Sequence, residues 1–220
     1  MALDNIHLRK LLKILFLDAA PRRSALRGDI REEIAREAGE TGSGGDFYGP
    51  FWFDAKCHVF GTADLHTCVE ERIAANGGRA NLYPLLRDGF LVWWNERRRW
   101  TNEPFRLGQA LKTNFQFPGV DANVKVDSIL SVRDGQDVEH FVYPYFAPTP
   151  ALSDEAARWG LWLLQRALPT VHPNELRILD VIRGRTFSID RHPLHGDEEE
   201  RFRVRYEQVL QERASLREEY

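Results

Sequence analysis

The stretch that decides the fold runs from Val124 to Phe146 and reads VKVDSILSVRDGQDVEHFVYPYF. Apolar and polar residues alternate over Val124–Val132, which is the period of a β-strand with one buried face. Arg133-Asp134-Gly135 supplies a turn, and Val138–Phe146 predicts a second strand. The sequence therefore predicts a β-hairpin at this point.

Outward from the hairpin, apolar residues at helical spacing predict several helices. The first helix is predicted to begin at Leu8 and end at Pro21, and the second to begin at Ser24. Three more are predicted over Asp64–Ala75, Asn81–Trp100 and Asp154–Leu168, and the last begins at Asp197. Two further strands, Leu176–Ile182 and Arg185–Ile189, are joined at Gly184 as a second hairpin. This order predicts an α+β fold, with N-terminal helices and a small mixed β-sheet flanked by helices.

Prolines and glycines divide the first quarter of the chain. Pro21 is predicted to end the first helix, so that Ser24 caps the second. Pro50 is expected to interrupt regular structure in the aromatic stretch Phe47–Phe53. The glycine-rich run Gly39–Gly45 predicts a flexible loop. It separates an N-terminal helical segment, residues 1–41, from an α+β core, residues 46–220, although both could form one continuous domain.

The composition is that of a globular protein. The 220 residues are 43% hydrophobic and 29% charged, which excludes collagen-like and wholly disordered chains. The net charge of -3 argues against a wholly basic nucleic-acid binder. No apolar run reaches the roughly 18 residues that span a bilayer, so no membrane contact is expected. The two cysteines cannot build a disulfide framework, which favours a cytoplasmic location.

From Gly61 to Ile189 the order of elements resembles that of the RecB-type PD-(D/E)XK nucleases. Gly61-Thr62-Ala63-Asp64-Leu65-His66 stands where that family carries a metal-binding histidine soon after a glycine. Val126–Leu130 resembles the strand that bears the family's aspartate, here Asp127. Phe141–Tyr145 stands where the acid-x-lysine motif would fall. The resemblance implies a restriction-endonuclease-like core.

The motif itself is altered. The family's chemistry uses two carboxylates to hold Mg²⁺ and a lysine to orient the attacking water. Tyr143 and Tyr145 occupy the places of the second acid and the lysine, and a neutral phenol is a poor Mg²⁺ ligand. The resemblance therefore implies a degenerate, non-catalytic chain without a cofactor. Such a chain would be a subunit of a bacterial DNA-processing or defence system, with a protein partner and DNA as its contacts.

A relocated active site is the alternative. Glu139 shares the strand face of Tyr143, and Lys125 lies two residues from Asp127 on the same face. Asp127, Glu139 and Lys125 would then be catalytic, and His66 with Asp127 would hold Mg²⁺ in an active metal-dependent nuclease. In the simpler interpretation Asp127 is a solvated hairpin residue. A third hypothesis is a protein-interaction module without a nucleic-acid role, using the stretch Phe47–Phe53.

Two other clusters carry chemistry. The segment WWNERRRW, residues 93–100, mixes indoles with cations, and Arg97, Arg98, Arg99 and Trp100 are candidates for binding nucleic acid. The same pattern also suits a buried helix face with arginines at its C-terminal end. Cys57, His58, His66 and Cys68 could offer four zinc ligands, but their spacing matches no familiar zinc motif, and cysteines often serve as small core residues.

Overall fold

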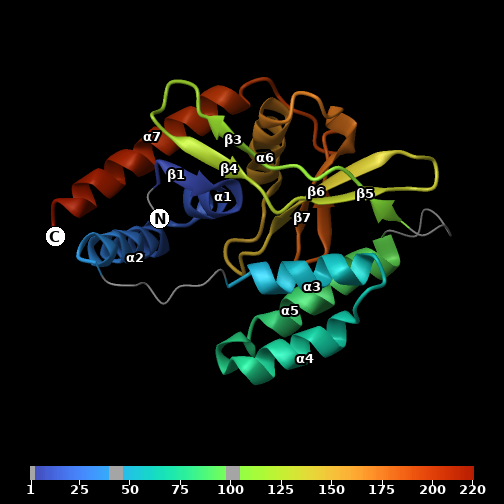
Figure 1. Cartoon of the computed structure of the whole chain (residues 1–220). Helices are drawn as coiled ribbons and strands as arrows, with labels where there is room; N and C mark the ends of the chain where they lie inside the picture. Colours follow the sequence, from blue (N-terminus) through green and yellow to red (C-terminus); the bar gives the residue numbers. More distant parts are fainter. Residues whose placement is uncertain (1–2, 40–46, 98–104) are drawn as a thin grey trace.

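The computed structural model describes residues 3–39, 47–97 and 105–220 (Figure 1). Within these ranges the chain is mixed α/β, with seven α-helices and two mixed β-sheets, in agreement with the predicted α+β class. In chain order the elements are β1 (Asn5–His7), α1 (Leu8–Phe16), α2 (Ala19–Glu37), α3 (Gly49–Val59), α4 (Leu65–Ala75), the 3₁₀ turn η1 (Gly77–Arg79), α5 (Tyr83–Val92), the π-helical turn η2 (Trp93–Arg97), β2 (Arg106–Leu107), β3 (Thr113–Gln116), β4 (Asn123–Val126), β5 (Leu130–Arg133), β6 (Glu139–Tyr145), α6 (Asp154–Ala167), η3 (Pro173–Glu175), β7 (Leu176–Asp180), β8 (Arg185–Phe187) and α7 (Glu198–Arg217).

The larger sheet has the strand order β2-β5-β6-β7-β8. β5 and β6 form the predicted hairpin, with Leu130 opposite Val142 and Arg133 opposite Glu139. Helix α6 carries the chain from β6 to the parallel strand β7, and β8 returns antiparallel to β7. The strand pairs β5–β6 and β7–β8 confirm both predicted hairpins.

The larger sheet is covered on both faces, so the molecule has three layers. α3, α4 and α5 lie on one side, and α6, α7, α1 and the smaller sheet lie on the other (Figure 1). Strand β6 shows why: Phe141 and Tyr143 belong to one core, while Val142 between them belongs to the other. β6 is buried at every position from Phe141 to Tyr145, which is typical of a strand in such a central layer.

The smaller sheet has the order β1-β4-β3 and corrects one prediction. The continuous strand Val124–Val132 is wrong, because β4 ends at Val126 and pairs with β1, whereas β5 begins at Leu130 in the other sheet. Ser128 lies between them with a left-handed φ of 63°. This residue turns the chain over, so that Val126 faces one core and Leu130 the other.

The N-terminal helices correct two more predictions. Pro21 does not end a helix: α1 ends at Phe16, and α2 begins at Ala19 with Asp18 as its N-cap, so Ser24 lies inside α2. Pro50 lies in the first turn of α3. Both prolines occupy a first turn, where the missing N–H would have no intrahelical acceptor. Most of the glycine-rich run lies outside the described residues, as do residues 98–104, into which the long predicted helix would extend.

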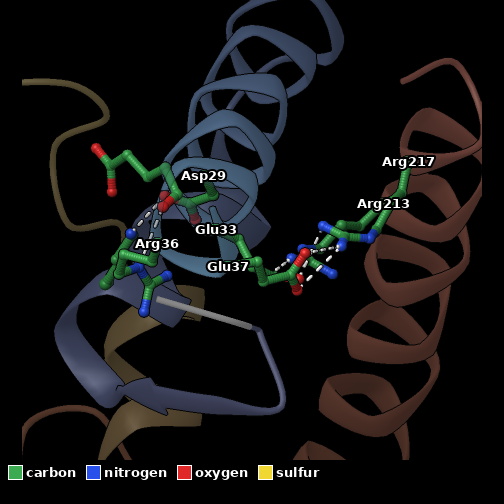
Figure 2. A network of polar contacts seen from close by, with 8 residues as sticks. Asp29, Glu33, Arg36, Glu37, Arg213 and Arg217 are labelled. Carbon is green, nitrogen blue, oxygen red and sulfur yellow. Dashed lines mark hydrogen bonds and ion pairs between the residues drawn. The ribbon is translucent and has the colours of Figure 1, made fainter. Parts of the chain in front are cut away.

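Helix α2 contacts the C-terminal helix α7 through ion pairs. Of its nineteen residues, only Leu26, Asp29 and Ile30 are buried. Glu33 pairs with Arg213 and with Arg217, whose Nη1 lies 2.9 Å from the carboxylate, and Figure 2 shows these groups converging from the two helices. The buried apolar residues of α1, α2 and α7 also belong to one core.

Candidate functional site around Asp127

Asp127 lies on the seam between the two sheets, in the linker from β4 to β5. Arg9 Nη1 donates to its Oδ1 over 2.8 Å, and His7 Nδ1 lies 3.1 Å from its Oδ2. The hydroxyl of Ser128 donates to Oδ1 at 3.1 Å. Both carboxylate oxygens are therefore engaged by groups of this chain, two of which come from residues about 120 positions away.

The start of helix α1 brings these groups together. His7 is the N-cap of α1, and no acidic residue lies in the first turn of the helix. The backbone N–H of Arg9 donates to the Tyr143 hydroxyl on β6 at 3.0 Å. A phenol thus satisfies one of the helix's free N–H groups, and Asp127 places a negative charge beside the positive end of the helix dipole.

Burial and charge act in opposite directions on Asp127. Burial alone would raise the pKa of its carboxyl, but the hydrogen bonds and positive charge of His7 and Arg9 outweigh it and hold the pKa well below the ordinary value. Complete burial raises the pKa of Tyr143 to about 12, even though Arg9 acts in the opposite direction. Near neutral pH the site therefore combines a carboxylate, a guanidinium and a neutral phenol.

Helix α3 closes the cluster from the other layer. Trp52 Nε1 donates to the carbonyl of Ser128, and Lys56 Nζ donates to the carbonyl of Ile129 at 2.8 Å. Burial lowers the pKa of Lys56, against the opposing attraction of Asp127. Two side chains of α3 thus donate hydrogen bonds to backbone carbonyls that lie in the break between β4 and β5, where no strand that the structure describes pairs with them.

The residues predicted to share a metal with Asp127 lie elsewhere. Glu139 is opposite Arg133 at the turn end of the hairpin, where its carboxylate accepts from Arg133 Nη2 and from the N–H of Gln109, each at 3.0 Å. Asp127 precedes the other end of β5, whose first residue Leu130 is about 10 Å from Arg133 along the strand at about 3.3 Å per residue. The hairpin therefore holds the two carboxylates apart.

The other two candidates also have their own positions. Lys125 lies on β4 opposite His7 of β1, so it flanks the cluster without an ion pair to Asp127 among the described residues. His66 is exposed on α4, which packs against α3 and α5 in the opposite layer. Of the predicted set, the structure brings only Lys125 into the neighbourhood of Asp127.

The predicted metal ligands form no common cluster in the described part of the chain. Cys57 and Cys68 are free, and His58 Nδ1 accepts from the N–H of Leu65 at 3.3 Å. A group of three possible ligands does occur at His195, Asp197 and Glu198. The buried Glu198 carboxylate, however, accepts the N–H groups of His195 and Gly196 at 2.7 and 3.0 Å, and so organises the loop that enters α7.

The predicted nucleic-acid segment is described only in its first half. Trp93 and Trp94 are 9% and 7% exposed and belong to the core beneath α3. This burial favours the core interpretation of these indoles over base stacking. The side chain of Arg97, and the whole of Arg98, Arg99 and Trp100, lie outside the described residues.

Sequence reasoning singled out Asp127 but missed its partners. His7, Arg9 and Lys56 carry no local signal, because their role depends on which strand meets β4 and which helix covers the linker. The pairing of β1 with β4 decides it, and β1 is only three residues long.

Comparison of the chain with protein-family models, with curated proteins and with solved structures found no match. Among the described residues, no helix combines the length and the apolar character that crossing a bilayer requires.

Proposed function

We propose that this chain is a non-catalytic protein with a degenerate restriction-endonuclease-like core that serves as a subunit of a DNA-processing or defence assembly in the cytoplasm. The observation that carries the proposal is the pairing of Asp127 with Arg9 and His7. At the place where the second acid of a nuclease would stand, Tyr143 is buried and holds the backbone of α1.

The chemistry of the cluster opposes metal binding. Mg²⁺ binds carboxylate oxygens at about 2.0–2.1 Å and needs several oxygen ligands around it. At Asp127 a guanidinium already contacts the carboxylate at 2.8 Å, and the imidazole of His7 lies against the other oxygen. The nearest phenol keeps its proton at neutral pH. The ion pair with Arg9 thus takes the place that a divalent cation would need.

The element order gives the proposal its second support. The hairpin β5–β6, the helix α6 and the strand β7 parallel to β6 follow one another in the order that the nuclease resemblance requires. Tyr145 stands where the lysine would be and is also buried. Its hydroxyl donates to the carbonyl of Pro150 at 2.8 Å. Both altered positions therefore serve packing.

Metal titration and a cleavage assay test the non-catalytic part. Isothermal titration of the chain with Mn²⁺ should give no binding tighter than about 1 mM, and supercoiled plasmid should stay intact with Mg²⁺ or Mn²⁺. Cleavage that Asp127→Ala abolishes would contradict the proposal. If Glu139→Gln abolished it as well, the relocated active site would be the better account.

Affinity purification of the tagged chain from the cells that produce it tests the subunit role. A stoichiometric partner that acts on DNA is expected. A chain that elutes alone, at the size of a single copy, would contradict that role.

A gel-shift titration tests contact with DNA. Substitution of Arg97, Arg98 and Arg99 by glutamine should weaken binding of duplex DNA and reduce its dependence on salt, because each phosphate contact releases a counterion. Unchanged affinity and salt slope would remove this segment from the proposal.

A further inference from the structure

A cavity of about 740 Å³ opens where the C-terminal end of α1 and the start of α2 face α6 and α7. The residues that carry its chemistry are Phe16, Arg22, Trp159, Val204 and Arg205. The cavity lies at the opposite end of α1 from Asp127, about 13 Å away for a nine-residue helix at 1.5 Å per residue. It is therefore separate from the cluster described above.

The floor of the cavity is aromatic. The rings of Phe16 and Trp159 are 4.8 Å apart and tilted by 60°, and Trp159 stacks on Phe202 beneath it at 5.3 Å. Val204 on α7 also lines the cavity and is 39% exposed. A flat apolar group can therefore cover surface that water now covers.

Two arginines border this floor in fixed positions. Arg205 Nε donates to the carbonyl of Leu15 at 3.1 Å, and Arg22 Nη1 donates to the carbonyl of Leu17 at 2.9 Å. Both guanidinium groups are thus held by the free carbonyls at the end of α1. Because these hydrogen bonds already restrict the two arginine side chains, ordering them on ligand binding would cost little conformational entropy.

The charges around the cavity leave Arg205 uncompensated. Arg22 Nε pairs with Glu212 at 2.7 Å, whereas Arg205 makes no ion pair with a carboxylate of the described chain. Burial and the neighbouring Arg22 guanidinium lower the pKa of Arg205, against the attraction of Glu212. An anion between Arg22 and Arg205 would relieve this repulsion.

The acidic residues that line the cavity do not supply that anion. Glu155 pairs with Arg201, and Glu200 pairs with Arg203 at 2.7 Å. Asp18 is exposed at the rim as the N-cap residue of α2, and its side chain makes no capping hydrogen bond. The unpaired positive charge beside the apolar floor therefore comes from Arg205, and the Arg22–Glu212 ion pair lies next to it.

We propose that this cavity binds a small organic anion, a planar apolar ring that carries one carboxylate or phosphate group. The acid group lies between Arg205 and Arg22, and the ring covers the half-buried Phe16 and the exposed Val204, with the buried Trp159 behind them. Nε and Nη1 of both arginines are already engaged, Nη1 of Arg205 by Gln208, so each guanidinium offers its Nη2 to the acid group. A ring over the exposed valine buries apolar surface.

A pair of dyes that differ by one charge tests the proposal. 8-Anilinonaphthalene-1-sulfonate should bind the folded chain at one site. 1-Anilinonaphthalene, which lacks the sulfonate, should bind at least tenfold more weakly. Arg205→Gln should weaken binding of the sulfonate at least tenfold, while Arg166→Gln, an exposed arginine of α6 that pairs with Glu199, should leave it unchanged. Equal binding of the two dyes, or a change below twofold in Arg205→Gln, would overturn the proposal.

A second variant and two competitors complete the test. Val204→Glu places a negative charge on the floor at an exposed position, so it should abolish binding of the anionic dye even if Arg205→Gln does not fold. Displacement of the dye by adenosine monophosphate assigns the acid group as phosphate, and displacement by indole-3-acetate assigns it as carboxylate. If neither compound displaced the dye at 5 mM, the proposed class of ligand would be contradicted, because a competitor at about this concentration displaces the dye when its Kd is about 1 mM.

Discussion

Asp127 shows how one residue can determine the character of a site. Its carboxylate meets β1 through His7, α1 through Arg9 and its own linker through Ser128. The same carboxylate that would bind a metal in an open site stabilises a helix start in a closed one. The difference lies in the partners that the fold brings to it.

Replacement of Asp127 by asparagine should lower the free energy of unfolding by roughly 1–3 kcal/mol at pH 7, because Arg9 and His7 lose their partner in a half-buried place. The pKa of the carboxyl is lower in the folded chain than the unfolded value of about 3.9. Between these values the unfolded chain binds more protons, so this contribution is present above about pH 5 and is lost as the pH falls through the folded pKa.

Urea unfolding between pH 3 and pH 7 checks this prediction. The difference between the natural chain and Asp127→Asn should be largest near pH 7 and shrink toward pH 3. Asp88→Asn, which removes an exposed carboxylate paired only with its neighbour Arg87, should change stability by less than about 0.5 kcal/mol. A difference that did not depend on pH would show that the carboxylate charge is not what stabilises the site.

Two helical glycines predict opposite effects of the same substitution. A Cβ at Gly89 on α5 would lie 2.1 Å from the carbonyl oxygen of Ile182, so Gly89→Ala must push α5 away from the turn after β7 and should cost more than about 2 kcal/mol. A Cβ at Gly28 on α2 meets nothing within 4 Å, so Gly28→Ala should stabilise the chain by about 0.5–1 kcal/mol. Thermal unfolding of both variants measures the difference, and equal effects would contradict this packing.

At the scale of elements, α1 illustrates how a short helix is completed from outside its own sequence. The nine-residue helix has no acidic residue in its first turn. At its N-terminal end, Arg9 donates to the Asp127 carboxylate through its side chain and to the Tyr143 hydroxyl through its backbone N–H. At its C-terminal end, backbone carbonyls accept hydrogen bonds from Arg22 and Arg205. Both ends of its dipole are therefore matched by distant residues. The two proposed properties of the protein, the closed acidic site and the anion cavity, lie at these two ends.

The contact between α2 and α7 should depend on its enclosed ion pairs. The side chains of Arg213 and Glu33 are 14% and 19% exposed, whereas those of Arg27 and Glu219 are 44% and 53% exposed. We expect Arg213→Gln to cost roughly 1–3 kcal/mol and to speed hydrogen exchange in α2, and Arg27→Gln to cost less than about 0.5 kcal/mol.

Urea unfolding at 0.05 and 0.5 M NaCl, together with hydrogen exchange, measures both effects. Salt should change the stability of the natural chain only slightly, because the enclosed pair is poorly screened. Similar losses in the two variants would show that the burial of the pair does not matter.

At the scale of the whole molecule, residues 3–39 contribute to the core and to the smaller sheet. Leu11, Leu12 and Leu15 of α1 are buried in the core that also contains α6 and α7, and β1 forms one edge of the smaller sheet. Removal of residues 1–39 should expose this core and leave a chain without a cooperative unfolding transition. Circular dichroism during heating checks this, and removal of residues 218–220 should preserve the transition. A truncated chain that unfolds cooperatively would show that the N-terminal segment is an independent unit.

Local patterns in the sequence predicted the elements whose structure depends on near neighbours. The helix α6 begins after its cap Ser153 as expected, and the two hairpins form where alternation and turn residues predicted them. The short strands β1, β2 and β3 were missed because they span three, two and four residues and, unlike the equally short β5 and β8, no turn signal joins them to a recognisable neighbouring strand.

By itself, the sequence determined the mixed α/β class and the two hairpins, and it offered Asp127 as a candidate, because periodicity and turn residues are local properties. Only the tertiary structure decided that Ser128 turns the chain from one sheet to the other, that Arg9 and His7 meet Asp127, and that Glu139 and His66 do not. These outcomes depend on contacts between residues more than a hundred positions apart, or on the layer to which a helix is assigned. The free energy of burying whole faces selects such contacts, and no local pattern encodes them.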